Sequence, residues 1–251
     1  MFSKDIDFSS ILKLSLFNIK IKHRQTVLGP VWVVLQSYIF IFFIGFLFTK
    51  AFNSSYEKII PHFACGFVLW QYFSSSLKEN CSIFFSSRGL LLSIPNKEFF
   101  IFFRTIAQNL IIFFYNFIVL LMILIYLDLK INFLLFLINF LILNFFLVFF
   151  SYILSIVCTK FQDLAKVFAS FLQVMFFVTP IVWEKKYLEK YQYIHDWNIF
   201  YVIIEICRAP LIDKNFNESM YYSYVVGFII LSLIMGSFLY SKFHKKITFW
   251  I

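Results

Sequence analysis

The sequence predicts an all-α integral membrane protein with six transmembrane helices, and three features of the chain support this. Of its 251 residues, 61% are hydrophobic and only 14% are charged, whereas about 25% are charged in a typical soluble domain. The hydrophobic residues gather in runs of about 20, the length that crosses a bilayer. The basic residues, which give a net charge of +9, lie mostly between these runs. In a soluble protein that excess suggests nucleic acid; here it indicates membrane topology, and we expect no nucleic-acid partner.

The predicted spans form a single transmembrane domain over residues 1–251. They cover residues 31–49, 61–77, 99–127, 133–159, 164–183 and 221–240. The second is shorter and more polar than the others, and the third carries Arg104 near its start. None contains Asp or Glu in its interior. A proton- or sodium-driven carrier normally needs such a residue, so energy for any transport is expected to come from another chain.

Charge predicts the side on which the termini lie. Six spans place both termini on one side. If that side is the cytoplasm, the inner segments hold 14 of the 22 basic residues with five acidic ones, and the outer segments hold eight of each. Since Lys and Arg collect in cytoplasmic loops, both termini are predicted to be cytoplasmic, with residues 241–251 as a cytoplasmic tail.

Residues 1–29 precede the first span. Apolar residues recur between Ile6 and Ile19 with a loose helical periodicity, while Lys13, Lys20 and Arg24 lie toward another side. A basic amphipathic helix in this position is expected to lie along the inner membrane surface. The alternative is an ordinary solvated basic tail.

Two connections between spans carry their own signals. Residues 78–99 mix three leucines with charged residues, and Pro95 marks a break, which predicts a short helix that needs lipid or a partner protein to cover its leucines. Residues 184–220 are long for a plain connection and contain an apolar stretch too short to span, which predicts re-entrant or interfacial helices. There, Glu205 and Arg208 are three residues apart and can pair on one helical face.

Signals of catalysis are missing from the sequence. It has no GxxxxGK[ST] phosphate loop, HExxH or GxSxG motif, and its four cysteines show no CxxC spacing. We therefore expect a chain that is not an enzyme and binds no metal or cofactor of its own.

Five segments in order resemble the permease subunits of ABC exporters for bacterial polysaccharides, the type-2 ABC group that handles O-antigen, capsule and teichoic acid. They are KIKHRQTVLGPVWVVLQ at the first span, CGFVLWQYF with a Gly-x-x-x-Trp pattern, LLLSIPNKEFF, KFQDLAKVFASFLQVMFFVTPIVW, and NIFYVIIEICRAPLI. The chain departs from the family pattern at Ile94, Lys160, Gln162 and Ile199. Together the matches cover essentially the whole chain.

The resemblance implies a homodimer in the bacterial inner membrane that binds two copies of a separate ABC ATPase, which carries the ATP and Mg. A lipid-linked polysaccharide, O-antigen as the first expectation, would pass between the first and fifth spans of the two copies. Alternatives are capsular polysaccharide or teichoic acid, and, more remotely, a lipid- or sugar-modifying membrane enzyme. The resemblance assigns the ATPase contact to Ser86, Arg88, Leu90, Leu91, Leu92, Pro95, Lys97 and Glu98. It assigns the outer gate to residues 184–220, including Asn198, Glu205 and Arg208.

The substrate path is expected to carry aromatic rings, amides and hydroxyls, which suit sugars. On the first span this predicts one stripe, made of Trp32, Gln36, Phe40 and Phe43. On the fifth span it predicts a similar strip, made of Ser170, Gln173, Phe177 and Thr179. For any single Phe, contact with lipid or with a neighbouring helix is a simpler explanation than a place in the substrate path. Gln36 and Gln173 are the stronger candidates, because an amide that faces lipid cannot make its hydrogen bonds. Dimer packing is a competing role for both.

Gly29 and Pro30 join the basic stretch to the first span. Proline is tolerated at a helix start, where its missing N–H is not needed. We expect this pair to form the hinge that turns the in-plane helix into the first span. Replacing either with Leu is expected to reduce export while the protein still inserts.

Overall fold

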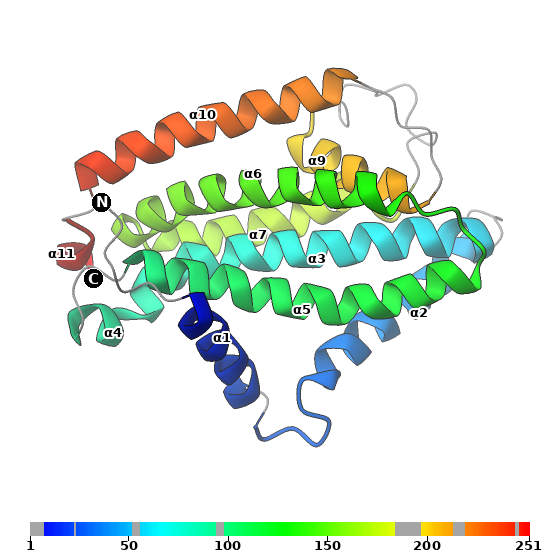
Figure 1. The fold of residues 1–251 in the computed structure, drawn as a ribbon, viewed down its shortest axis with the longest axis horizontal. Helices are drawn as coiled ribbons and strands as arrows, with labels where there is room; N and C mark the ends of the chain where they lie inside the picture. The colour runs from blue at the N-terminus through cyan, green and yellow to red at the C-terminus, as the bar shows by residue number, and fades with distance from the viewer. Residues whose placement is uncertain are drawn as a thin grey trace.

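The computed structural model describes residues 8–22, 24–51, 56–93, 98–183, 197–212, 219–243 and 246–251. Across these ranges the chain is helical and contains no strand (Figure 1). The long helices are α2 (Val31–Ala51), α3 (Tyr56–Ser86), α5 (Glu98–Tyr126), α6 (Phe133–Lys160), α7 (Asp163–Val178) and α10 (Ser219–Phe243). The shorter ones are α1 (Phe8–Lys22), α4 (Arg88–Ser93), α9 (Ile199–Arg208), the 3-10 helix η2 (Ala209–Leu211) and α11 (Ile247–Trp250).

Four of these helices are long and apolar enough to cross a membrane: Val31–Lys50, Glu98–Tyr126, Phe133–Lys160 and Met220–Phe243. The chain is therefore a multi-pass membrane protein. Helices α2, α5, α6 and α10 begin and end within three residues of the spans predicted from the sequence. The other two predicted spans also form helices, but their bounds differ more.

Helix α3 has 31 residues, whereas the sequence predicts a span over residues 61–77. At 1.5 Å per residue it is about 46 Å long, more than the hydrocarbon thickness of about 30 Å. The prediction ended at Lys78 because charged residues follow it. The helix continues because most of its side chains are buried by five neighbours, α2, α5, α6, α7 and α9. A helix covered on nearly all sides can carry polar residues that lipid would not accept.

Helix α7 ends at Val178, five residues before the end of the predicted fifth span. Thr179 has an extended backbone, with φ −77° and ψ 132°. The residue before a proline is disfavoured in the helical region, so Pro180 accounts for this end. At 16 residues α7 is short for a bilayer crossing.

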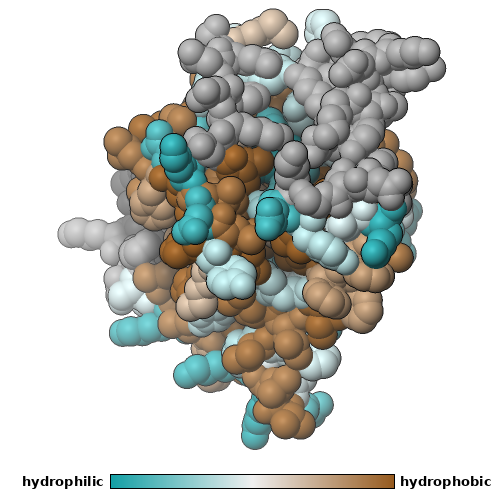
Figure 2. All heavy atoms as spheres, turned by 90° about the vertical axis from the view of Figure 1, so that its right-hand side faces the viewer, coloured by the Kyte–Doolittle hydropathy of each residue, from teal (hydrophilic) through white to brown (hydrophobic). Residues whose placement is uncertain are grey.

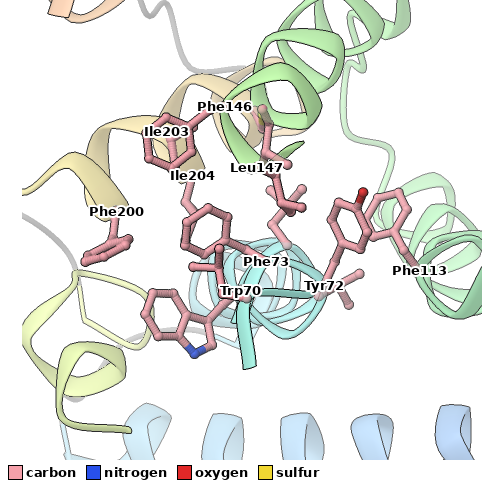
Figure 3. Close-up of a cluster of buried hydrophobic side chains, with 14 of the residues drawn as sticks. Trp70, Tyr72, Phe73, Phe113, Phe146, Leu147, Phe200, Ile203 and Ile204 are labelled. Carbon is pink, nitrogen blue, oxygen red and sulfur yellow. The ribbon is translucent and has the colours of Figure 1, made fainter. Parts of the chain in front are cut away.

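The interior is built from aromatic side chains that radiate from α3 (Figure 3). Phe73 faces Phe146 of α6 at 6.0 Å between ring centroids and Phe200 of α9 at 5.6 Å. On another side Tyr72 lies 5.1 Å from the Phe113 ring of α5. Each such ring buries a large apolar area at a contact between two helices, so this aromatic core holds α5, α6 and α9 against α3.

The short helices α4 and α11 lie together at the left of Figure 1, where α3 ends and α5 begins. We call this the α4 end of the bundle. The turn from α5 to α6, around Asp128, lies at the opposite end. Helix α1 packs against α5 and crosses it at a steep angle rather than running along it (Figure 1).

Helix α1 has a buried stripe with a repeat of four residues. Ile11, Ser15 and Ile19 are buried, and the Ser15 hydroxyl donates to the Arg104 carbonyl of α5 at 3.0 Å. Phe17 and Ile21 are more than half exposed, and Lys13 and Lys20 are exposed too. This arrangement of apolar and basic exposed residues is typical of a helix at a membrane surface.

Hydrophobic side chains cover much of the described surface (Figure 2). On α10, for example, exposed residues include Ile230, Leu231, Ile234 and Phe238. A soluble monomer rarely exposes such continuous apolar area, whereas lipid requires it.

Candidate functional site

The predicted path residues of α2 lie on a surface of the chain. Trp32 and Phe40 are each 39% exposed, Phe43 is 61% exposed, and Gln36 is also exposed. Phe40 stacks on Phe67 of α3, with 4.8 Å between ring centroids. These side chains thus form an exposed stripe that is anchored on α3 at its middle.

The predicted path residues of α7 divide into two groups. Ser170, Gln173 and Phe177 are exposed, with Phe177 at 70%. Thr179 is fully buried and its hydroxyl accepts a hydrogen bond from the Asn198 amide at 3.1 Å. In this chain Thr179 therefore joins the end of α7 to α9 and contributes nothing to an exposed surface.

Aromatic rings hold α2 and α7 to the same part of α3. The Phe176 ring of α7 lies 6.4 Å from that of Phe40 and 6.1 Å from that of Phe67, and Trp70 lies 6.0 Å from Phe176. The structure thus brings together the two helices from which the sequence predicts a path.

A polar cavity that the sequence analysis did not predict lies between α2, α3 and α5, with a volume of about 240 Å³. Its polar lining comes from four helices: Lys22 of α1, Gln36 of α2, Gln71, Ser75 and Glu79 of α3, and Asn109 and Asn116 of α5. We call this cavity the polar slot. Gln71, Ser75 and Glu79 are four residues apart, which places them on one face of α3. That spacing was the available sequence signal, but the partners on other helices could not be read from it.

Hydrogen bonds organise the slot at its charged end. One Glu79 carboxylate oxygen accepts from the Asn109 amide at 2.8 Å, and the other lies 3.4 Å from the Lys22 ammonium. Deeper in, the Ser37 hydroxyl donates to the Gln71 amide oxygen at 2.9 Å. Asn116 is 2% exposed, and its amide oxygen has no hydrogen-bond partner among the described residues.

The predicted hinge is longer than a corner of two residues, and the structure describes residues 24–30 of this connection. Gly29 has φ +56°, a left-handed conformation that favours glycine. Its N–H bonds the Thr26 carbonyl at 3.3 Å, and the Trp32 N–H bonds the Gly29 carbonyl at 3.2 Å. Pro30 immediately precedes the first residue of α2. The connection is therefore an ordered turn that has a backbone requirement at Gly29.

The predicted ATPase contact includes the short helix α4. Ser86, Arg88 and Leu90 are exposed, and Leu92 is 57% exposed. Leu91, by contrast, is 2% exposed and belongs to the hydrophobic core. The expectation that all three leucines lack cover in this chain is therefore corrected: successive side chains of an α-helix point about 100° apart, so Leu91 can face the core while Leu90 and Leu92 are exposed. Glu98 begins α5, while Pro95 and Lys97 lie outside the described residues.

The predicted outer gate contains one described α-helix, α9, which is buried almost throughout. Asn198 caps it by accepting from the N–H groups of Phe200 and Tyr201, at 3.0 and 3.3 Å. The Asn139 amide of α6 donates to the Ile206 carbonyl at 2.6 Å. Helix α9 is thus packed into the bundle; residues 184–196 and 213–218 of the predicted gate lie outside the described chain.

The predicted pairing of Glu205 and Arg208 is confirmed. The Arg208 guanidinium donates to Glu205 Oε2 through Nε at 2.7 Å and also through Nη2. Its Nη1 donates to the Pro180 carbonyl at 3.1 Å. Arg208 is 1% exposed and Glu205 is 5% exposed. A buried cation is tolerated only when it is paired and hydrogen-bonded, so this network ties α9 to the residues that follow α7.

Comparison with known proteins shows the family to which this chain belongs. The ABC-2 type transporter family matches the sequence over residues 11–212. The chain belongs to this family. A search of curated proteins finds no match. ABC-2 membrane subunits are the transport components of ABC transporters, so this chain is a permease of that kind, and the family in general implies an ABC ATPase as partner. Among the described residues, no three His, Cys, Asp or Glu side chains come together as metal ligands.

Proposed function

We propose that this ABC-2 permease forms a homodimer in the bacterial inner membrane, with both termini in the cytoplasm, and exports a lipid-linked polysaccharide. O-antigen is the first candidate, and capsular polysaccharide or teichoic acid the second. Two copies of an ABC ATPase would supply the energy, and ATP and Mg would bind there. The ordered resemblance of five segments to polysaccharide permeases supports this substrate class.

The observation that carries the proposal is the position of two amides, Gln36 on α2 and Gln173 on α7. Both are exposed in the single chain, on helices that meet the same aromatic group of α3. An amide facing lipid loses its hydrogen bonds with water at a cost of about 1–3 kcal/mol or more. A path for sugar hydroxyls between the two copies would satisfy both amides, while exposed Phe43 and Phe177 would offer apolar faces to sugar rings.

The test is ATP-driven movement of a lipid-linked oligosaccharide into proteoliposomes that contain the permease and its ATPase. Gln173→Leu is expected to lower the transport rate about two- to tenfold, the worth of one hydrogen bond of about 0.5–1.5 kcal/mol. Gln36→Leu is expected to act in the same direction. Gln108→Leu on α5, whose side chain is not part of the lining of the polar slot, is the matched control and should transport normally.

The alternatives give different results in this assay. Transport of a teichoic-acid precursor but of no lipid-linked sugar chain would select the second substrate class. Unaltered transport by Gln173→Leu, with normal insertion and ATPase binding, would remove α7 from the path and leave dimer packing as the role of that amide.

A further inference from the structure

Apart from Gln36, which lies at the edge shared by both, the residues of the polar slot have no role in the function proposed above, which uses the exposed faces of α2 and α7. It nevertheless holds a buried amide oxygen, that of Asn116, without a described partner. Leaving such an atom unsatisfied is costly, and native proteins generally pair it with protein, water or ligand. We infer that the polar slot is a binding site in each protomer for the uncharged, hydroxyl-rich ring of a glycolipid headgroup.

The position of the slot suits a lipid headgroup. Glu79 lies toward the α4 end of α3, and the lining continues along the helix to Val68. Eleven residues at 1.5 Å each make this a depth of about 16 Å, roughly half of the hydrocarbon thickness. Lys22, with its side chain 58% exposed, and exposed Gln36 also line the slot. A headgroup can therefore enter at the level of α1, the predicted surface helix, and reach polar groups below it.

The charges of the slot favour a neutral ligand. Its one carboxylate, Glu79, is already engaged by Lys22 and Asn109, so a metal ion or ammonium group would have to displace both. An anion would meet Lys22 but also the Glu79 carboxylate beside it. The other polar groups are amides and a hydroxyl, from Gln36, Gln71, Ser75, Asn109 and Asn116. Amides both donate and accept, which is what ring hydroxyls need.

The size and the apolar surroundings of the slot agree with a single ring. Its volume of about 240 Å³ is below the range of about 300–1,000 Å³ that encloses drug-sized ligands, so a polymer does not fit. Tyr72 and Phe113 contribute aromatic surface to the lining. Next to Gln36 on α2, Leu35 and Ile39 are 39% and 45% exposed, and they provide an apolar surface along which acyl or prenyl chains can lie.

The experiment uses the full-length chain in nanodiscs of phosphatidylethanolamine and phosphatidylglycerol, without ATPase. The probe is a glucosyl diacylglycerol that carries a diazirine on its sugar, and cross-linked peptides are mapped by mass spectrometry. We expect cross-links to α3 between Val68 and Glu79 and to α5 between Asn109 and Asn116. A phosphatidylethanolamine with a headgroup diazirine is the comparison, and it should label these peptides at least tenfold less.

Two variants and a matched control test the amides. Asn116→Leu and Gln71→Leu are expected to lower the yield of these cross-links about tenfold, whereas Gln108→Leu on α5 should not change it. Normal gel-filtration profiles exclude a general folding defect. The mapping on the unaltered chain decides the question even if Asn116→Leu fails to fold. Absence of cross-links in the slot both from this probe and from a polyprenyl-linked hexose with the same diazirine, or equal labelling by phosphatidylethanolamine, would overturn the inference.

This inference rests on the proposed function only for the sugar chemistry of the headgroup. A polyprenyl-linked hexose with the same diazirine distinguishes the two sources: labelling by it alone identifies the exported lipid, and labelling by both probes identifies a general glycolipid site. Binding is measured without ATP, so the two ideas can fail separately. Binding without transport would refute polysaccharide export and keep the site, and transport without binding would do the reverse.

Discussion

Gly66 on α3 leaves the space in which the Arg208 guanidinium lies. A Cβ at this position would be 2.9 Å from Arg208 Nη1 and 3.2 Å from the Ile181 side chain. The same Nη1 donates to the Pro180 carbonyl. The buried ion pair of α9 therefore depends on a residue about 140 positions earlier in the chain, which belongs to the Gly-x-x-x-Trp pattern. Here the glycine serves close approach rather than an unusual backbone.

Gly66→Ala is expected to destabilise the permease by about 1–3 kcal/mol, as overpacking typically does. The added methyl group would push Arg208 away from Pro180 and weaken its pairing with Glu205. Thermal unfolding of the purified protein in detergent measures the change. Gly227→Ala on α10 is the matched control, because a Cβ there meets nothing within 4 Å. If both variants unfold at the same temperature as the native protein, the close packing at Gly66 is not needed.

At the scale of elements, the connection between α1 and α2 requires an unusual backbone conformation at one residue, Gly29, whose φ is positive. Gly29 combines φ +56° with open space around its Cβ position. A Cβ at this position would meet nothing within 4 Å, so the first effect of a substitution is on the backbone conformation.

Gly29→Leu is expected to cost about 1–2 kcal/mol in the left-handed conformation and to alter the angle at which α2 leaves α1. In the proteoliposome assay we expect slower ATP-driven transport, with normal membrane insertion. Gly29→Asn is the control, because Asn adopts this conformation readily, and it should restore most of the rate. Equal rates for Leu and Asn would mean that the angle is not used in transport.

Helix α4 carries a buried leucine, Leu91, beside an exposed one, Leu92. Core packing and the proposed ATPase contact can therefore be tested separately on this helix. Leu92→Asp is expected to lower the amount of ATPase that co-purifies with the permease at least tenfold, because exposed Leu92 is proposed to pack against that partner. Leu91→Ala should instead lower thermal stability, by about 2–5 kcal/mol for a fully buried leucine. Phe249→Asp on α11, also an exposed residue at the α4 end, is the control for added charge. Reduced co-purification by Phe249→Asp alone would place the contact on α11.

The elements that the sequence predicted well are those whose apolar runs face lipid. Residues 99–127 and 133–159 nearly coincide with α5 and α6, because continuous hydrophobicity marks both the helix and its environment. Helix α3 was predicted too short, since Lys78 and Glu79 resemble the start of a loop. Only packing reveals that the Glu79 carboxylate accepts a hydrogen bond from Asn109 of α5 and pairs with the Lys22 ammonium of α1.

The candidate sites show the same division. The three-residue spacing of Glu205 and Arg208 predicts their pairing, but their burial and the contact with Pro180 depend on the position of α9. The α7 strip was predicted from types of side chain, without the break that Pro180 causes, and so Thr179 was included although it is buried. Sites within one helix can be read from spacing, whereas sites between helices require the fold.

At the scale of the whole molecule, the two ends of the bundle differ in charge. At the α4 end, Arg88 of α4 and Lys246, which immediately precedes α11, are exposed, and α1, which packs against α5, exposes Lys20. The inner segments of the proposed topology hold the entire net charge of +9, and the outer segments are neutral. Because cytoplasmic loops retain Lys and Arg, we expect the α4 end to face the cytoplasm, where an ATPase can reach α4.

Cysteine labelling can test this orientation, because the four native cysteines are all buried and should react slowly. Lys130→Cys, in the exposed connection between α5 and α6, is expected to react with a membrane-impermeant maleimide in intact spheroplasts. Ser93→Cys, exposed at the end of α4, should react only after the membrane is opened, at least tenfold more than before. The reverse pattern would invert the proposed topology, and labelling of both from outside would contradict a bundle whose two ends lie on opposite sides of the membrane. The native protein without added cysteine gives the background, so the orientation of the bundle in the membrane can be assigned before any substrate is known.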